Sequence, residues 1–431
     1  MVGTLLLLLS AATNTGHHVQ AHGAGIIEDS GKFYMIGEDK TDGSAFQNIN
    51  CYSSTNLVEW TFENALLTQQ PSGDLGPNRV VERPKVIYND ATSTYVMYLH
   101  IDSSNYGEAK VGVATSDTVC GDYNYHGSYR PLGFESRDIG LFKDDDGSAY
   151  LLTEDRPNGL RIDALSDDYL NTTRNVYLWN RNIESPAIWK KNGYYFMFGS
   201  LLTGWDPNDN VYSYATSLSG PWSPWKEFAD DGANTYSSQT SFILPWGDSA
   251  IYMGDRWKSS NLMRSTYVWL PLELTGTTDI WLKNRVNWVP DAKSRTWAPG
   301  PSESRYEGEA ATLSGGAVKA SCSGCSGSSV IGYLGGPDAG RLEWTGVRSD
   351  ATTRTTLRIR HLNGDSKERR ATVSVNGIEQ QVAFLPSENM NTPASASVHC
   401  DLKAGSANTI VISTSDGSWA PDIDQVFVPL S

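Results

Sequence analysis

The sequence predicts an all-β protein in which a five-bladed β-propeller is followed by a β-sandwich. Long helical periodicity is nearly absent, and short runs of apolar and aromatic residues alternate with Gly, Asn, Asp and Pro. One strand–turn–strand pattern occurs five times, with starts roughly 45–60 residues apart, which is typical of propeller blades. After residue 305 the sequence changes to regularly spaced strands rich in Ser, Thr and Gly, as in a sandwich.

Each of the five repeats begins with a polar residue that could take part in chemistry. A short apolar run, a turn and a second, aromatic-rich run then follow, which together predict a β-hairpin. The repeats start at His22, Glu82, Asp138, Glu184 and Gln239. Because the innermost strands of propeller blades begin at the same end of a central channel, we expect these five side chains to converge on one pocket.

The chain of 431 residues is longer than a usual single domain, so we expect two domains. We assign residues 15–297 to the propeller and 306–431 to the sandwich, of jelly-roll type. A segment rich in Pro, Ser and Gly, residues 298–305, is predicted to link them. Asn363-Gly364 and Asn376-Gly377 predict tight hairpin turns in the second domain.

Residues 1–14 contain a run of leucines followed by small residues, and we interpret them as a secretory signal segment. The alternative is an apolar first strand. No apolar run approaches the roughly 20 residues that span a bilayer. We therefore expect a secreted, extracellular protein.

The formal net charge of -15 argues against nucleic acid and an anionic membrane surface as partners, because both attract Lys and Arg. It favours a neutral ligand. We expect the protein to be a monomer.

The chain holds five cysteines, so at least one thiol has no intramolecular partner. Cys322-Ser-Gly-Cys325 has the spacing of a zinc or redox motif. Zinc would need a second ligand pair nearby, and a redox motif would need a βαβ setting. We therefore expect a local disulfide.

Three carboxylates in one pocket match the chemistry of glycoside cleavage, which needs a proton donor and either a nucleophile or a water-activating base. Glu184 is the candidate general acid, because the apolar strand that follows it would bury its carboxyl group and raise its pKa. Asp138 beside it would further oppose its ionisation. Glu82 is next to Arg83, which could hold it ionised or bind a sugar hydroxyl. His22 is interpreted as a buried channel histidine.

A solvated strand end is the usual explanation for a single Asp or Glu, and only the shared position in the repeat favours catalysis here. No further histidines stand at metal-ligand spacing, so we expect no cofactor for catalysis. Three aromatic residues near the strand starts, Tyr106, Trp205 and Trp257, could stack on sugar rings. Packing in the core is the alternative for each.

The second domain begins and ends with acidic residues. Glu307 and Glu309 lie on its first strand, and Asp422 and Asp424 lie on its last. The terminal strands of a sandwich often pair, and carboxylate oxygens are the ligands that calcium prefers. A calcium site is therefore one interpretation of these residues.

The propeller portion resembles glycoside hydrolase family 43, and within it the fungal exo-β-1,3-galactanases. The C-terminal portion resembles a family 35 carbohydrate-binding module. The motifs that carry the first resemblance are Gln20–Ile26, Glu82–Lys85, Glu184–Pro186 and Leu202–Asn210, and those that carry the second are Tyr306–Ser314, Gly332–Gly335 and Trp419–Gln425.

The family resemblance implies an inverting five-bladed propeller that uses a base Asp on blade one, a pKa-tuning Asp on blade three and an acid Glu on blade four. Asp138 and Glu184 match the last two, whereas His22 stands where the base Asp is expected. The galactanase subgroup then implies that Gln239 activates water and that Glu82 binds substrate. Because a neutral amide is a poor base, we expect Gln239 and Glu82 to share the base role.

The resemblance implies release of galactose from the non-reducing ends of the β-1,3-galactan backbones of arabinogalactan, with inversion. A family 43 arabinofuranosidase or xylosidase, and a non-catalytic lectin-like propeller, are the alternatives. For the module, the resemblance implies a structural calcium held by Glu307, Glu309 and Asp424. It also implies a sugar site in loops, for which the candidates are Tyr333, Asp338, Trp419 and Asp422.

Overall fold

The computed structural model describes residues 6–7, 13 and 15–430. It is all-β, as predicted, and divides into two compact units. One unit comprises residues 20–55 and 62–284. The other comprises the N-terminal residues to Val19, the loop Asn56–Thr61 and the chain from Arg285 onward.

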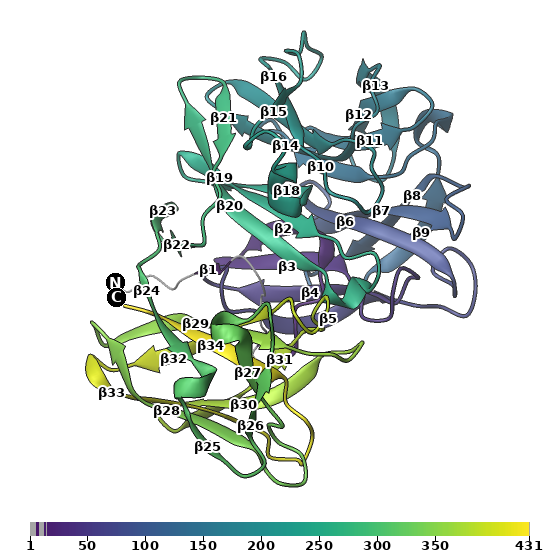
Figure 1. Ribbon diagram of the computed structural model, residues 1–431. Coiled ribbons are helices and arrows are strands. Elements are labelled where there is room, and N and C mark those ends of the chain that lie inside the picture. The colour runs from purple at the N-terminus through teal and green to yellow at the C-terminus, as the bar shows by residue number, and fades with distance from the viewer. Residues whose placement is uncertain (1–5, 8–12, 14, 431) are drawn as a thin grey trace. The chain divides into compact units, whose positions relative to one another are not determined.

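The first unit contains five four-stranded antiparallel sheets among the described residues, each formed by consecutive strands (Figure 1). The first strands of the five sheets contact one another in a closed ring, in the order β2, β6, β10, β14, β18 and back to β2. The sheets are β2 (His22–Asp29), β3 (Lys32–Glu38), β4 (Asn48–Ser54), β5 (Thr61–Thr68); β6 (Arg79–Asn89), β7 (Thr94–Ser103), β8 (Lys110–Ser116), β9 (Asn124–Tyr129); β10 (Ile139–Lys143), β11 (Ala149–Asp155), β12 (Gly159–Leu165), β13 (Thr172–Trp179); β14 (Glu184–Lys191), β15 (Tyr194–Ser200), β16 (Val211–Ala215), β17 (Lys226–Glu227); and β18 (Gln239–Trp246), β19 (Ser249–Arg256), β20 (Thr266–Thr275), β21 (Asp279–Leu282).

Strand β7 shows why the sequences of these strands are nearly continuous runs of apolar residues. Its side chains alternate between the two faces of the sheet. Met97 and Leu99 pack in a core cluster with Ile36 of the first sheet, whereas Val96 and Tyr98 pack with residues of the third sheet. Both faces of the sheet are therefore buried between neighbouring sheets, and few polar residues are tolerated in its interior.

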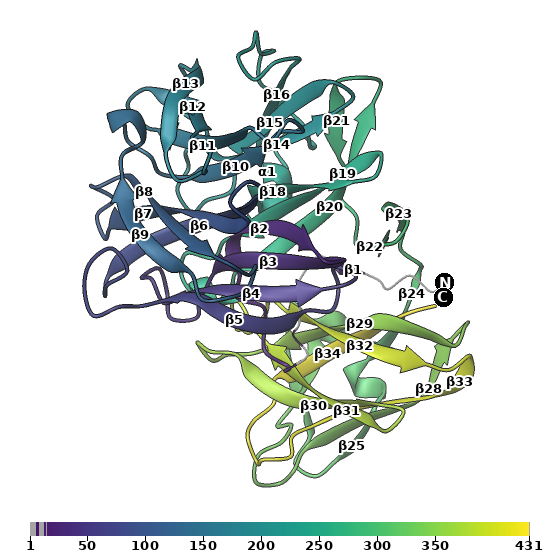
Figure 2. The same ribbon diagram turned by 180° about the vertical axis from the view of Figure 1, so that it is seen from behind.

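The second unit consists of two sheets with a shared core, which Figure 2 shows from behind. Trp344 and Val373 from one sheet pack against Ile359 and Val426 from the other. One sheet holds β24 (Glu303–Glu307), β26 (Val318–Ser321), β27 (Ser329–Gly332), β29 (Thr353–Leu362), β32 (Ala394–Leu402) and β34 (Asp422–Pro429); the other holds β25 (Thr312–Ser314), β28 (Arg341–Ser349), β30 (Arg369–Val375), β31 (Ile378–Phe384) and β33 (Gly405–Ser413).

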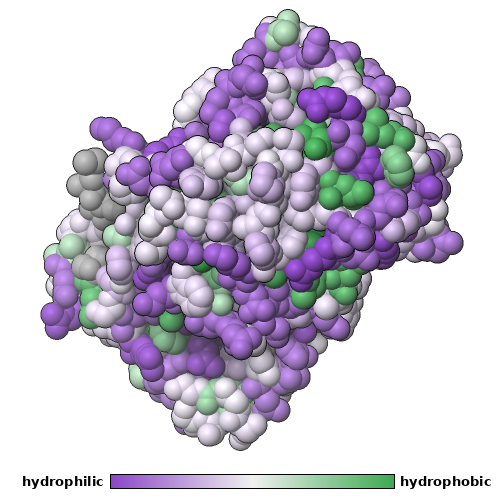
Figure 3. All heavy atoms as spheres, turned by 90° about the horizontal axis from the view of Figure 1, so that it is seen from above, coloured by the Kyte–Doolittle hydropathy of each residue, from purple (hydrophilic) through white to green (hydrophobic). Residues whose placement is uncertain are grey.

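A small sheet joins β1 (Leu6–Leu7), β22 (Asn287–Asp291) and β23 (Thr296–Pro299). Short helical segments complete the described elements: α1 (Asn234–Ser237), η1 (Pro131–Gly133), η2 (Leu262–Arg264), η3 (Gly308–Ala310) and η4 (Ser326–Ser328). In the part of the chain that the structure describes, no helix is both long and apolar enough to cross a bilayer. The face in Figure 3 is mainly polar, and its apolar residues form small separate groups.

The domain boundaries differ from the prediction at the linker. Residues 298–305 are not a free connection, because β23 ends at Pro299 and β24 begins at Glu303. β24 pairs with the last strand, β34, and this pairing draws the segment into the second unit. Of the predicted signal segment, Leu6–Leu7 form β1 and pair with β22, and most of its other residues lie outside the described ones.

One of the two predicted hairpin turns is confirmed and the other is wrong. Asn376-Gly377 joins paired strands β30 and β31, in register from Val375 to Ile378. Asn363-Gly364 follows β29, but the next strand lies in the other sheet, so the chain crosses over instead of folding back. The buried amide of Asn363 donates to the carbonyls of Lys367 and Phe384, and this side chain organises the crossover.

The predicted Cys322–Cys325 disulfide is confirmed. A second disulfide, Cys51–Cys120, joins β4 to the loop after β8 and so connects the first two sheets. Cys400 is the buried free thiol that the odd count required.

Candidate active site

The strand starts of the sheets surround one pocket of about 210 Å³. This volume is below the roughly 300–1,000 Å³ of pockets that enclose drug-sized ligands, so we expect it to enclose a single sugar residue. Four of the five repeat starts line it: Glu82, Asp138, Glu184 and Gln239. The predicted Arg83, Tyr106, Trp205 and Trp257 line it too, as do six residues that were not predicted: Glu38, His100, Arg137, Glu154, Arg156 and Gly204.

His22 is the repeat start that does not line the pocket. It is fully buried, its ring stacks on Tyr267 at 4.8 Å, and its Nδ1 lies 3.1 Å from Asp255 Oδ1. The interpretation of His22 as a buried channel histidine fits this position. The expectation that all five repeat starts meet in one pocket was wrong for this residue, because the imidazole packs against Tyr267 and Asp255 and is not part of the pocket lining.

A local break in the strands turns the catalytic candidates into the pocket. The pairing register shifts directly after Glu82 and after Glu184, as in a β-bulge. The next residues, Arg83 and Ser185, have φ of 53° and 56°, which L-residues with side chains rarely adopt. Both precede proline, which ordinarily favours extended backbone, so tertiary contacts must hold this conformation.

Such contacts are present at both bulges. The Ser185 hydroxyl donates to Asp138 Oδ2 at 2.6 Å, and the backbone N–H of Arg83 donates to Glu38 Oε1 at 3.1 Å. Each bulge is thus held by a carboxylate from the neighbouring sheet.

Glu184 has the environment of a general acid. Its side chain is buried, and burial, reinforced by the charges of Asp138 and Glu154, raises the pKa of Glu184 to about 9. Arg83 and Arg156 oppose this shift only in part. The carboxyl group therefore carries its proton at neutral pH and can donate it to a leaving group.

Gln239 contacts Glu184 directly. Its Nε2 donates to Glu184 Oε1 at 2.8 Å and to Ser200 Oγ at 3.2 Å. Its Oε1 accepts from Trp257 Nε1 at 2.9 Å and from the Arg83 guanidinium. Because indole and guanidinium groups only donate, the orientation of the amide is unambiguous.

This contact differs from the arrangement expected of a water-activating group. An inverting pair is separated by roughly 6.5–9.5 Å to leave room for water. With its amide 2.8 Å from Glu184, Gln239 lies beside the candidate acid rather than opposite it.

Glu82 is surrounded by two hydrogen-bond donors, Lys40 and Tyr106, and by the imidazole of His100. Lys40 Nζ lies 3.3 Å from its Oε1, the Tyr106 hydroxyl donates to the same oxygen at 3.2 Å, and His100 Nδ1 lies 3.5 Å from Oε2. Burial alone would raise the pKa of Glu82, but Lys40, His100 and Arg83 outweigh burial and lower it to about 2. Glu82 is therefore ionised and well placed to accept hydrogen bonds.

Arg83 is held by protein groups rather than left free for a ligand. Its guanidinium lies 3.2 Å from Asp138 Oδ2, donates to the Thr240 carbonyl at 3.3 Å and to Gln239, and lies 5.9 Å from the Trp257 ring centre. Trp205 packs edge-on against Trp257 at 5.0 Å, so the two indoles form one wall of the pocket.

Some of the lining residues missed in the sequence share a signal. They lie on the second strand of each sheet, across from the repeat start. Glu38 pairs with His22, His100 with Glu82, and the Glu154 N–H donates to the Asp138 carbonyl at 3.0 Å. Each of the three is the polar residue at the end of the second apolar run of its repeat, and this position could have predicted them from the sequence.

The acidic residues of the second unit also come together. The first and last strands pair as predicted, with Glu307 opposite Gln425. Ser326 donates through its N–H to Asp424 Oδ1 at 2.9 Å and through its hydroxyl to Glu307 Oε1 at 3.0 Å, and Ser329 donates to Glu309. The second oxygen of each carboxylate is buried without a hydrogen bond, and that of Asp424 lies 3.2 Å from Arg360 Nε in an ion pair.

The predicted sugar-binding residues of the second unit include an exposed aromatic pair. The rings of Tyr333 and Trp419 meet edge-on at 6.0 Å, and both side chains are exposed. Asp422 is half-buried next to Gly332, one residue before Tyr333. Asp338 is exposed in the turn that Gly335 and Gly340 close.

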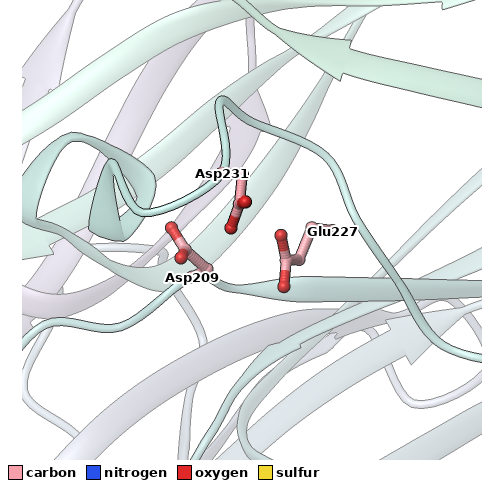
Figure 4. A group of neighbouring side chains, drawn as sticks. All are labelled: Asp209, Glu227 and Asp231. Atoms are coloured by element: carbon pink, nitrogen blue, oxygen red, sulfur yellow. The ribbon is translucent and has the colours of Figure 1, made fainter.

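One acidic cluster lies outside the predicted sites. The carboxylates of Asp209, Glu227 and Asp231 point toward one another, with oxygens within 4.8 Å (Figure 4). Glu227 and Asp231 are exposed. Among the described residues this is the one trio of His, Cys, Asp or Glu side chains with such spacing. The calcium-ligand candidates Glu307, Glu309 and Asp424 are therefore spaced more widely than this.

Two family models match parts of this chain. Residues 19–237 match the family model of glycosyl hydrolases family 43, and residues 341–428 match a model described as the CBM13 domain of α-galactosidase. No protein with a curated description matches the sequence.

The chain is similar in structure to an exo-β-1,3-galactanase of Phanerochaete chrysosporium solved with galactose, with 39% identity and a TM-score of 0.70 over 99% of this chain and 100% of that chain. The same relative was solved with β-1,3-galactotriose in variants in which one glutamate is Gln or Ala. An exo-β-1,3-galactanase of Clostridium thermocellum shares 25% identity, with a TM-score of 0.66 over 99% of both chains. The chain belongs to glycosyl hydrolase family 43.

Proposed function

We propose that this protein is an exo-β-1,3-galactanase, which releases galactose with inversion from the non-reducing ends of β-1,3-galactan backbones of arabinogalactan. The observation that carries the proposal is 39% identity over nearly the whole chain to an enzyme of that activity. The pocket supports it, since a small pocket with a buried acid suits the removal of one terminal sugar at a time.

In this mechanism Glu184 protonates the glycosidic oxygen as the bond to the next sugar breaks. Asp138 keeps Glu184 protonated before the reaction, because its charge opposes ionisation of the neighbouring carboxyl group. Glu82 and Tyr106 bind hydroxyls of the terminal galactose, and Trp205 and Trp257 pack against its ring. Arg83 organises the pocket through Asp138 and Gln239.

Gln239 is proposed to take part in activating water by holding it with the amide oxygen. The water oxygen bonds to the anomeric carbon as the glycosidic bond breaks, and the proton that the water loses passes to solvent, because a neutral amide is too weak a base to keep it. For this its hydrogen bond to Glu184 must break when the sugar enters, so that the amide can turn toward a water on the opposite face. Until it turns, Gln239 holds the Glu184 carboxyl in position.

Product analysis by NMR on β-1,3-galactan tests the proposal. We expect galactose as the product, with the α-anomer appearing first because inversion changes the configuration of a β-linkage. Longer oligosaccharides would show endo cleavage, and a β-anomer appearing first would show retention. Activity only on arabinofuranosides or xylosides would favour those members of the family, and binding without turnover would favour a lectin-like protein.

We interpret the ring of five sheets as a five-bladed propeller and the second unit as a jelly-roll sandwich of carbohydrate-binding family 35. Tyr333 and Trp419 form its proposed sugar-stacking surface, with Asp338 and Asp422 as hydrogen-bond acceptors. Binding there would raise the local concentration of the enzyme on polymer.

A structural calcium in this module is proposed to bind Glu307, Glu309 and Asp424. Three buried carboxylate oxygens without hydrogen bonds fit a hard cation, which together with Arg360, 3.2 Å from Asp424, would offset the mutual repulsion of the three charges. We further propose that the protein is secreted and monomeric, and that catalysis needs no cofactor.

A further inference from the structure

A buried row of alternating charges runs from the first sheet to the second, beside the pocket. Lys40 Nζ lies 2.6 Å from Glu38 Oε2 and 3.3 Å from Glu82 Oε1. His100 lies 3.5 Å from Glu82 through Nδ1 and 3.1 Å from Asp102 through Nε2. None of the five side chains is more than 10% exposed.

We propose that Lys40 and His100 are positioning residues that keep Glu82 ionised throughout the working pH range, and that this excludes Glu82 from the proton-transfer steps. The inference rests on the proposed function, in which Glu82 contacts the terminal sugar. It assigns a role to two side chains that contact Glu82, of which His100 also lines the pocket.

The charge on His100 is secured by Asp102. The carboxylate of Asp102 accepts from the backbone N–H groups of Glu108 and Ala109 at 2.8 and 3.1 Å. These bonds and His100 outweigh the effect of burial and lower the pKa of Asp102 to about 2. Burial opposes the charge on His100, but Asp102 and Glu82 together raise its pKa to about 9. Below about pH 9, Glu82 therefore faces a cation on this side.

The other groups that face Glu82 do not alter this balance. Tyr106 donates a neutral hydrogen bond, and Arg83 adds a positive charge that Asp138 shares. Burial raises the pKa of Glu38, and Lys40 lies between its carboxyl group and that of Glu82. A carboxylate whose pKa is held at about 2 is a very weak base, so it accepts hydrogen bonds without removing a proton from water.

The test compares pH dependence among variants. His100→Gln and Lys40→Met remove one positive charge each, so the pKa of Glu82 rises and its protonated form accumulates as the pH falls. A rise of about 3 units would bring the pKa of Glu82 from about 2 to about 5, so the ratio of variant to wild-type kcat/KM should drop by about fourfold between about pH 7 and pH 4.5, through KM rather than kcat. Lys40→Arg keeps the charge and Tyr106→Phe removes only a neutral bond, so both ratios should stay constant with pH.

A constant ratio for His100→Gln would overturn the proposal, because a purely structural role predicts an equal loss at every pH. If Lys40→Met fails to fold, since it leaves two buried carboxylates without their cation, His100→Gln decides alone. Galactose binding measured by calorimetry at the same two pH values gives a second readout. A wild-type protein that binds galactose but leaves β-1,3-galactan intact would refute the proposed function, while the binding ratios would still test the charge relation.

Discussion

Replacing Asp138 by Asn tests whether Glu184 is the general acid. The substitution keeps the shape of the side chain and removes a charge that, after burial, does most to raise the pKa of Glu184 to about 9. Arg83, 3.2 Å from Asp138, keeps its positive charge and would then favour ionised Glu184. Because a neighbouring charge shifts a pKa by roughly 1–3 units, we expect the pKa of Glu184 to fall by about 2 units.

The shift should appear in the alkaline limb of the pH profile. Activity needs protonated Glu184, so it is full below the pKa and is lost as the pH rises through it. The kcat/KM of the wild type on β-1,3-galactobiose should fall near pH 9. That of Asp138→Asn should fall near about pH 7. Asp146→Asn, which changes an exposed carboxylate in a turn of the same sheet, is the matched control and should keep the wild-type limb.

An unchanged alkaline limb in folded Asp138→Asn would refute this reasoning. It would mean that Glu184 is not the titrating acid, or that Asp138 does not act on it. A limb that moves equally in Asp146→Asn would point to a general charge effect instead.

Five further outcomes are expected. Glu184→Gln should lower the rate on galactan by on the order of 10²-fold or more, and less on substrates with good leaving groups; equal loss on both would contradict acid catalysis. The same variant should be more stable than wild type at about pH 7, by about 1–3 kcal/mol in urea unfolding. In the wild type, the raised pKa of Glu184 contributes stability that is full below about pH 4.5 and declines as the pH rises toward 9, whereas Gln does not titrate and loses nothing. Gln239→Ala should abolish turnover but retain galactose binding by calorimetry, and loss of both would indicate a collapsed pocket. Chelation should lower the melting temperature of the full chain and added calcium should restore it, whereas Asp424→Asn should melt alike in chelator and calcium. Trp419→Ala should weaken attack on polymer while leaving hydrolysis of the disaccharide unchanged, and a loss on both would place Trp419 in the catalytic site.

The sequence alone determined the repeat, because hydrophobic period and turn residues act locally. Five hairpin units with a polar residue at each start were visible as alternating runs, and four of those starts, Glu82, Asp138, Glu184 and Gln239, line one pocket. The Cys322–Cys325 disulfide was predictable for the same reason, since the two cysteines are only three residues apart. The strand pairing that brings Glu307 close to Asp424 also followed from a general rule about terminal strands.

Only the tertiary structure decided which partners each charge meets. The burial of His22 against Tyr267, the Lys40–Glu82–His100 row and the contact of Gln239 with Glu184 all join residues from different strands or sheets. The pKa of a side chain depends on burial and on charges within a few ångströms, and neither is encoded by position in a repeat. The crossover at Asn363 was hidden for a similar reason, because a turn dipeptide specifies a local bend, whereas the sheet that the next strand joins depends on long-range packing.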